Sequence, residues 1–163
     1  MKKALSVDQA LYKLAAYCST AERCTVDIVK KLEKWEILPE KHSEIIERLK
    51  KERFLDEKRY CRAFVNDKIK FMKWGILKIK YELRKKNIPE SIISEALEEM
   101  YPKEASSVLN DLLLAKKRTT KGKNDYEIKQ KLIRYAIGKG FPPGEIFQSM
   151  KKIYTDFEES EFP

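Results

Sequence analysis

The stretch that decides the fold runs from residue 54 to residue 100 and reads FLDEKRYCRAFVNDKIKFM (54–72), KWG (73–75), ILKIKYELRKKN (76–87), IP (88–89) and ESIISEALEEM (90–100). In the three longer pieces apolar residues recur three or four positions apart, which predicts three amphipathic helices in succession. Asp56 can cap the first helix through its side-chain oxygen. Gly75 interrupts the pattern, and Asn87 before Pro89 predicts the end of the second helix. The chain therefore contains at least one three-helix unit.

The first of these helices carries an apolar stripe and a basic face. The stripe is made of Tyr60, Phe64 and Phe71 with Ala63, and it is widened by Cys61, Val65 and Met72. This spacing predicts that the three aromatic rings pack in the core, although stacking on nucleic-acid bases is an alternative. Trp74, in the turn beside Gly75, is the aromatic residue kept as a candidate contact.

Positive charge is concentrated in two segments. Residues 58–86 hold 11 Lys/Arg and two acidic residues (11 − 2 = +9), which equals the formal net charge of the whole chain. Residues 116–139 hold nine Lys/Arg and two acidic residues (9 − 2 = +7), so the remaining residues sum to 9 − 9 − 7 = −7. This polarity favours a polyanion or an acidic protein surface as partner. The alternative is that each charge run is only the solvated face of a helix.

One helical unit is predicted to occur three times. Leu32, Leu83 and Leu132 are separated by 51 and 49 residues (83 − 32 and 132 − 83), and each follows an isoleucine four positions earlier. Each leucine is followed by a turn marked by proline, at Pro39, Pro89 and Pro142. A fixed period with matching turns indicates a helical repeat array, whereas chance similarity among amphipathic helices is the alternative.

The predicted fold is therefore all-α, an elongated and curved array of three tandem three-helix repeats of helix-turn-helix character. The composition agrees, since 37% of the 163 residues are charged, 42% are hydrophobic and only five are glycine. Residues 1–53, 54–101 and 102–155 are predicted as the three repeats, of which the second is central and basic. Residues 156–163 are predicted as an acidic flexible tail.

Catalytic, metal and cofactor sites are not predicted. His42 lies in a charged helix start, Cys18 and Cys24 do not have a zinc-site spacing, and KRTTKGKN (117–124) lacks the first glycine of a phosphate-binding loop. The three cysteines are odd in number, which suits a reduced cytoplasmic protein better than a disulfide framework. No apolar run approaches the roughly 20 residues of a membrane span.

The central residues resemble a known family. FLDEKRYCRAFV followed by WGILKIKYELRKKNIPESIISEAL is similar to the central signature of the RecX family of bacterial regulators of the RecA recombinase. The matching positions are Asp56, Glu57, Arg59, Tyr60, Phe64, Gly75, Ile79, Glu82, Leu83, Ile88, Ile92, Ala96 and Leu97. ALYKLAAYCSTAERCTVDIVKKLEKW (10–35) resembles the opening helix pair of the family, with Cys24 where a serine is more usual. The third repeat matches mainly by helix pattern.

The resemblance implies a protein without catalytic activity that lies in the groove of the RecA–DNA filament. It implies that RecA ATP hydrolysis, coprotease activity and strand exchange are modulated, usually suppressed, in recombination, DNA repair and the SOS response. The expected partners are the RecA filament and, weakly and electrostatically, single- and double-stranded DNA, with the protein acting as a monomer. The candidate contact residues are Arg62, Lys70, Lys73, Trp74, Lys78, Lys80, Arg84, Lys85, Lys116, Lys117, Arg118, Lys121, Lys123, Lys131 and Arg134. The alternative is a helical DNA-binding module that acts without RecA, because short helices with a basic middle helix also describe that class.

Overall fold

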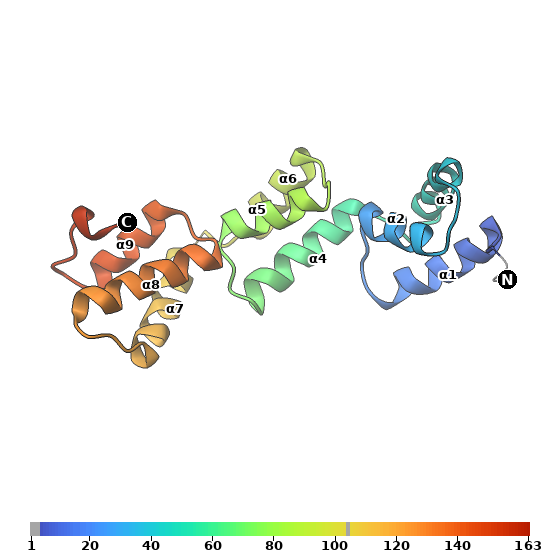
Figure 1. The fold of residues 1–163 in the computed structure, drawn as a ribbon. Coiled ribbons are helices and arrows are strands. Elements are labelled where there is room, and N and C mark those ends of the chain that lie inside the picture. Colours follow the sequence, from blue (N-terminus) through green and yellow to red (C-terminus); the bar gives the residue numbers. More distant parts are fainter. Residues whose placement is uncertain (1–3, 104) are drawn as a thin grey trace. The chain divides into compact units, whose positions relative to one another are not determined.

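The computed structural model describes residues 4–103 and 105–163, and these residues form nine α-helices, one short 3-10 helix and no strand. In chain order they are α1 (Val7–Thr20), α2 (Thr25–Lys34), α3 (Pro39–Lys51), α4 (Glu57–Lys70), α5 (Ile76–Lys85), α6 (Glu90–Met100), α7 (Ala105–Thr119), α8 (Asp125–Lys139), α9 (Pro143–Ile153) and η1 (Glu159–Glu161) (Figure 1). The predicted all-α class is confirmed.

Several helices begin where a side chain accepts a hydrogen bond from a backbone N–H of the first turn, or where a proline has no N–H to satisfy. Ser6 and Gln9 form a reciprocal capping box at α1. The Asp56 carboxylate accepts a bond from the Arg59 backbone N–H at 3.0 Å, and the Asn124 side chain accepts one from the Glu127 N–H at 2.9 Å. Pro39 is the first residue of α3, where its missing N–H costs nothing. Of these starts, the cap at Asp56 was predicted above from the sequence.

The middle helices α2, α5 and α8 end in the same way, which is the clearest structural sign of repetition. Glu36, Asn87 and Gly140 follow these helices with positive φ values of 57°, 56° and 95°. In each case the next residue is a buried apolar one whose backbone N–H donates to the carbonyl five residues back: Ile37 to Leu32 at 3.0 Å, Ile88 to Leu83 at 3.3 Å, and Phe141 to Ala136 at 3.2 Å. This is the Schellman pattern of helix termination. The end of α3 shows the same hydrogen bond, from Phe54 to Leu49 at 2.9 Å after Arg53 with a φ of 62°, but Phe54 is only half-buried.

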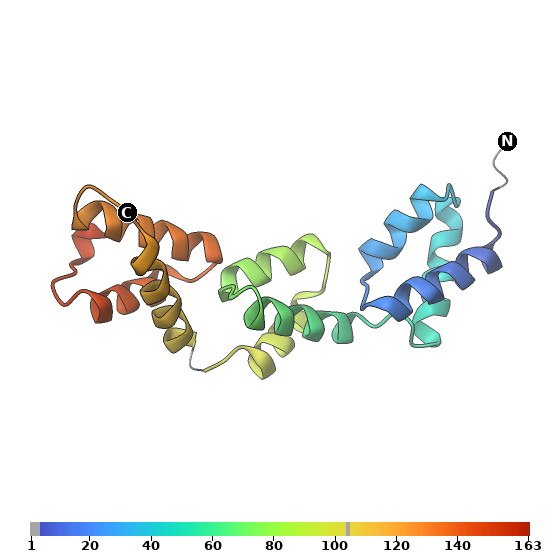
Figure 2. The same cartoon turned by 90° about the horizontal axis from the view of Figure 1, so that it is seen from below.

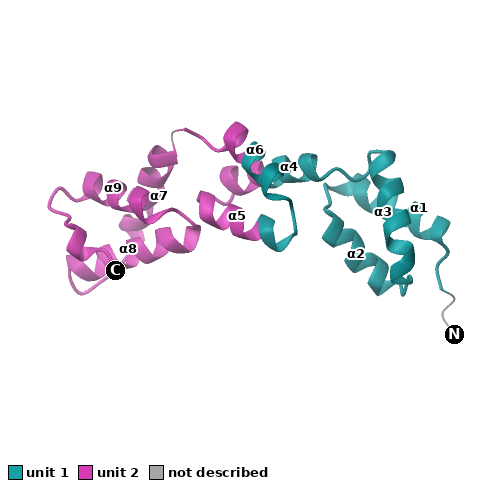
Figure 3. Ribbon diagram, turned by 90° about the horizontal axis from the view of Figure 1, so that it is seen from above, with its two compact units in different colours: residues 1–64, 83–96 teal, residues 65–82, 97–163 magenta. Residues whose placement is uncertain are grey.

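The chain divides into two compact units, coloured in Figure 3. Unit 1 comprises Met1–Phe64 and Leu83–Ala96, and unit 2 comprises Val65–Glu82 and Leu97–Pro163. In unit 1 the core of α1, α2 and α3 is built from Ala10, Leu14, Ile28, Leu32, Ile37, Ile45, Leu49 and Leu55. In unit 2, α7, α8 and α9 pack on one another (Figure 2) around Leu109, Leu113, Leu132, Ile133, Ala136, Phe141, Ile146, Met150 and Phe157.

A half-buried ion pair in unit 1 fastens the end of α5 to the start of α2. The Lys86 ammonium lies 2.8 Å from the Asp27 carboxylate, which also accepts a bond from the Cys24 backbone N–H at 3.2 Å. Burial raises the pKa of Asp27, but the bonds from Lys86 and Cys24 outweigh it, so the net pKa is lowered from the ordinary value of an aspartate. The bond to Asp27 raises the pKa of Lys86. The pair therefore favours the folded state whenever both groups are charged.

We expect Lys86→Met to lower the free energy of unfolding by about 1.5–3 kcal/mol at pH 7, the usual range for a lost hydrogen bond to a charged group. Because the folded pKa of Asp27 is depressed, this stabilisation is present above pH 4 and is lost as the pH falls through the folded pKa. Urea unfolding at pH 7 and at pH 3 should show a difference between wild type and variant that shrinks at the lower pH. Arg84→Gln, which breaks the exposed pair with Glu90, is the matched control and should change little. An equal loss for both variants would contradict this account.

Two features differ from the sequence-based expectation. Phe71 is 70% exposed and Met72 is 44% exposed, because α4 ends at Lys70 and the following residues no longer belong to its apolar stripe. Residues 156–163, predicted as a flexible tail, belong to unit 2 and contribute to its core. Phe157 is buried, and the Glu161 carboxylate lies 3.2 Å from the ammonium of Lys129, whose side chain is only 7% exposed. A buried ammonium needs a carboxylate partner, and the acidic segment provides one.

Candidate functional site

Unit 2 contains a close junction between the start of α5 and the end of α8. The Gly75 N–H donates to the Lys139 carbonyl at 2.7 Å, and the Leu77 N–H donates to the Gly140 carbonyl at 2.9 Å. The first N–H groups of a helix and its last carbonyls lack partners within the helix, so each helix end satisfies the other here. The positive end of one helix dipole also faces the negative end of the other. We call this contact the α5–α8 junction (Figure 1).

Two glycines permit the junction. A Cβ atom on Gly75 would lie 2.4 Å from the backbone carbon of Gly140, and a Cβ on Gly140 would lie 2.3 Å from the Cβ of Lys78. Real Cβ atoms do not approach other atoms so closely. Gly140 also has a φ of 95°, which a side chain would strain. The backbones therefore touch only because neither residue has a side chain.

Lysine side chains cross the junction in both directions. The Lys78 ammonium donates to the Gly138 carbonyl at 3.3 Å, and the Lys139 ammonium donates to the Met72 carbonyl at 3.1 Å. These bonds place two positive charges at the junction, one from α5 and one from α8. Both residues are half-exposed.

These two lysines and two others lie over aromatic rings. The ammonium groups of Lys68 and Lys78 lie 4.8 Å and 4.6 Å from the ring centre of Trp74. Those of Lys116 and Lys139 lie 4.8 Å and 5.7 Å from the ring centre of Tyr135. These are cation–π distances. We define the lysine–aromatic cluster as Lys68, Trp74, Lys78, Lys116, Tyr135 and Lys139, all of them in unit 2.

The fifteen residues predicted from the sequence are divided between the units. Unit 1 holds Arg62, Arg84 and Lys85, and unit 2 holds the other twelve: Lys70, Lys73, Trp74, Lys78, Lys80, Lys116, Lys117, Arg118, Lys121, Lys123, Lys131 and Arg134. Lys70 and Lys73 are exposed at the end of α4 and in the turn that follows, while Lys80 is half-buried on α5. Lys116, Lys117 and Arg118 are exposed in the last turn of α7. Twelve of the fifteen predicted residues thus lie in unit 2, and three of them, Trp74, Lys78 and Lys116, belong to the lysine–aromatic cluster.

Some predicted cations are already paired with acids. The Arg84 guanidinium makes a fork with the Glu90 carboxylate, with bonds of 3.0 Å and 2.7 Å. Lys131 forms an ion pair with Glu127 at 3.4 Å and donates to the Lys121 carbonyl at 2.6 Å. Such pairing reduces the charge that these side chains offer to a partner.

Sequence reasoning did not select three members of the cluster, Lys68, Tyr135 and Lys139. Lys139 stands between two glycines in GKGFPPG (138–144), which reads locally as a helix end. Its role depends on the carbonyl of Met72, 67 residues away. The signal in the sequence was that Gly75 and Gly140 each stand at the end of a predicted helix. A glycine permits close backbone approach, but the sequence does not show that these two helix ends meet.

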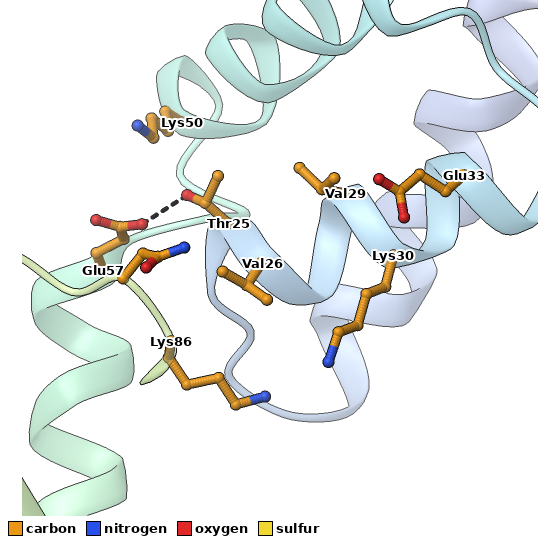
Figure 4. A pocket seen from close by; sticks show the side chains of 9 residues that line it. Thr25, Val26, Val29, Lys30, Glu33, Lys50, Glu57 and Lys86 are labelled. Carbon is orange, nitrogen blue, oxygen red and sulfur yellow. Dashed lines mark hydrogen bonds between the residues drawn. The ribbon is translucent and has the colours of Figure 1, made fainter. Parts of the chain in front are cut away.

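A cleft in unit 1 is a second candidate. It has a volume of about 500 Å³ and is lined by Thr25, Val26, Val29, Lys30, Glu33, Lys50, Glu57, Lys86 and Asn87 (Figure 4). Its charged groups are of both signs, and Glu57 accepts a bond from the Thr25 hydroxyl at 2.6 Å. Lys86 is paired with Asp27. Because the charges that line this cleft are of both signs and partly paired, we expect it to attract a polyanion less strongly than the lysine–aromatic cluster does.

Within the parts of the chain that the structure describes, no helix is both long and apolar enough to cross a membrane. In the same residues, His, Cys, Asp and Glu side chains do not gather in groups of three or more as metal ligands. Cys18, Cys24 and Cys61 are free thiols, and the last two are buried.

Comparison with known proteins agrees with this architecture. The model of the RecX second three-helix domain matches residues 56–97, and that of the RecX third three-helix domain matches residues 107–150. The chain is 32% identical over 144 residues to the regulatory protein RecX of Oceanobacillus iheyensis, an alignment that covers 85% of this chain and 51% of that protein. It is 28% identical over 148 residues to the regulatory protein RecX of Prosthecochloris aestuarii, covering 91% and 95%. The chain belongs to the RecX family.

A solved RecX structure has the same fold. The crystal structure of a regulatory protein RecX superposes with a TM-score of 0.81 at 26% sequence identity, covering 90% of this chain and 73% of the other. The chain spans about half the length of the Oceanobacillus RecX, whereas it spans nearly all of the Prosthecochloris RecX. The α5–α8 junction joins the two segments that match RecX domains. Gly75 lies in the segment that matches the second domain, and Gly140 lies in the segment that matches the third. In RecX terms, the lysine–aromatic cluster is therefore shared by the second and third domains.

Proposed function

We propose that this protein binds the RecA–DNA filament in its groove and inhibits the ATPase, coprotease and strand-exchange activities of RecA. Membership of the RecX family supports this proposal, because it is a family of regulatory proteins. The observation that carries the site assignment is the lysine–aromatic cluster, which brings four ammonium groups to the region of the α5–α8 junction. Through this activity the protein would regulate recombination, DNA repair and the SOS response, and it would act without catalysis of its own.

The proposed contact surface is the cluster together with its exposed basic neighbours. Lys70 and Lys73 precede Trp74, and Lys117 and Arg118 follow Lys116 at the end of α7. Clustered lysines and arginines neutralise phosphates and release counterions, which gives affinity without sequence preference. We propose weak electrostatic contact with single- and double-stranded DNA in the filament, by a cytoplasmic monomer.

The salt dependence of binding tests the electrostatic part of this proposal. If about five cations meet phosphates, the logarithm of the association constant should fall against the logarithm of salt concentration with a slope of roughly −3.5 for single strands and −4.5 for duplex DNA. Fluorescence anisotropy of labelled oligonucleotides over 50–300 mM salt measures the slope. A slope near zero would contradict phosphate contact.

A second measurement separates the two functional classes. Binding to RecA filaments assembled on single-stranded DNA should be tighter than binding to the same DNA alone if RecA is a partner. Equal affinity for bare and RecA-coated DNA would instead favour a DNA-binding module that acts without RecA. Co-sedimentation of the protein with the filaments measures this difference directly.

A further inference from the structure

The lysines of the cluster are restrained by the groups that they contact. The Lys78 and Lys139 ammonium groups each contact a ring and a backbone carbonyl. An ammonium has three N–H donors, so one bond to a carbonyl leaves two donors for another acceptor. The ammonium groups of Lys78 and Lys139 are thus held in place while N–H donors remain for another acceptor.

The two rings that contact the lysines are themselves partly buried. Tyr135 is half-buried on α8 and packs against the core of unit 2. Trp74 is half-buried in the α4–α5 turn, where its backbone N–H donates to the Lys68 carbonyl at 3.0 Å. Each ring is therefore partly buried and has two ammonium groups placed over it.

Restraint of a lysine matters for binding because a free lysine loses rotamer freedom when it meets a phosphate. A lysine already held on a ring loses less. By contrast, Lys121 and Lys123 lie exposed in the loop before α8, and no ring contact restrains them in the described structure. Lysines of the same charge should thus differ in their contribution to phosphate binding.

We propose that Trp74 and Tyr135 are positioning residues, which hold Lys68, Lys78, Lys116 and Lys139 ready for the phosphates of a nucleic-acid strand. The rings act through the lysines and do not stack on bases. This inference rests on the proposed function in one respect, that DNA phosphates are the ligand. It adds a specific role for two rings whose contribution the charge pattern alone does not show.

The test uses two labelled strands of equal length, a thymidine oligonucleotide and an abasic deoxyribose-phosphate strand, without RecA. Trp74→Leu removes the ring and keeps every charge, so we expect binding to both strands to weaken about three- to tenfold with an unchanged salt slope. Trp74→Phe keeps a ring and should restore most of the affinity. Tyr135→Leu and Tyr135→Phe should behave in the same way.

A double-mutant cycle separates positioning from a purely structural role. In the Lys68→Met/Lys78→Met background, Trp74→Leu should have no further effect, because the groups that the ring positions are gone. A loss confined to the thymidine strand would show base stacking and overturn the proposal. So would an equal loss in both backgrounds, or absence of binding by the wild type to either strand. RecA ATPase inhibition, measured separately, reports on the proposed function, and its failure would leave the outcome of the cycle unchanged.

Discussion

Replacing Gly75 with alanine is expected to lower the free energy of unfolding of unit 2 by about 3 kcal/mol. The new Cβ would lie 2.4 Å from the Gly140 backbone, and neither backbone can move without lengthening the bonds of 2.7 Å and 2.9 Å between the two helix ends. Overpacking alone costs about 1–3 kcal/mol, and weakened buried backbone bonds add to it. Urea unfolding followed by circular dichroism measures the change.

Gly138→Ala is the matched control for this substitution. A Cβ at Gly138 would meet nothing within 4 Å, and the residue lies inside α8. Alanine there should stabilise the protein by about 0.5–1 kcal/mol, because it is the better helix former. Amide hydrogen exchange at Leu77 should speed up in Gly75→Ala and stay unchanged in Gly138→Ala. If the two variants unfold at the same urea concentration, the close junction does not exist in solution.

The second large effect is expected on RecA itself. Reversing three charges together, with Lys68→Glu, Lys73→Glu and Lys116→Glu, should raise the concentration needed for half-inhibition of RecA ATP hydrolysis more than about tenfold. Three ammonium groups that would approach phosphates are replaced by carboxylates that repel them. The two lysine-to-carbonyl bonds of the junction, from Lys78 and Lys139, stay intact in this variant.

A variant with the same change of charge elsewhere is the control. Lys30→Glu, Lys50→Glu and Lys51→Glu also remove three lysines and add three carboxylates, but they lie on α2 and α3. If inhibition depends on the cluster, this control should retain most of its activity. Equal loss in both variants would mean that net charge alone controls inhibition, and would remove the cluster from the site.

The features that the sequence predicts well are those encoded over a few neighbouring residues. The caps at Ser6, Asp56 and Asn124 each need an oxygen side chain three positions before the N–H that it satisfies. The predicted end of α5 at Asn87 also follows a local rule, in which a residue that tolerates a positive φ precedes a buried apolar one. Local rules of this kind were enough to predict an all-α repeat fold.

The features that the sequence does not predict depend on contacts between distant residues. The pairing of Gly75 with Gly140 joins positions 65 residues apart, and either glycine alone reads as a simple helix terminator. The exposure of Phe71 follows from the end of α4 at Lys70, whereas its spacing alone placed it on the apolar stripe. The order of the C-terminal segment depends on Lys129, a buried ammonium that the local pattern does not reveal. Charge counting found the basic segments but could not choose among their lysines, because only the fold shows which ones rest on rings.

A titration of this protein into RecA, single-stranded DNA and ATP tests the central claim most directly. The steady-state rate of ATP hydrolysis should fall as protein is added, reaching strong inhibition at less than one protein per RecA subunit, because one bound molecule would act on a filament of many subunits. An unchanged hydrolysis rate at saturating protein, with filaments present and the protein folded, would contradict the account.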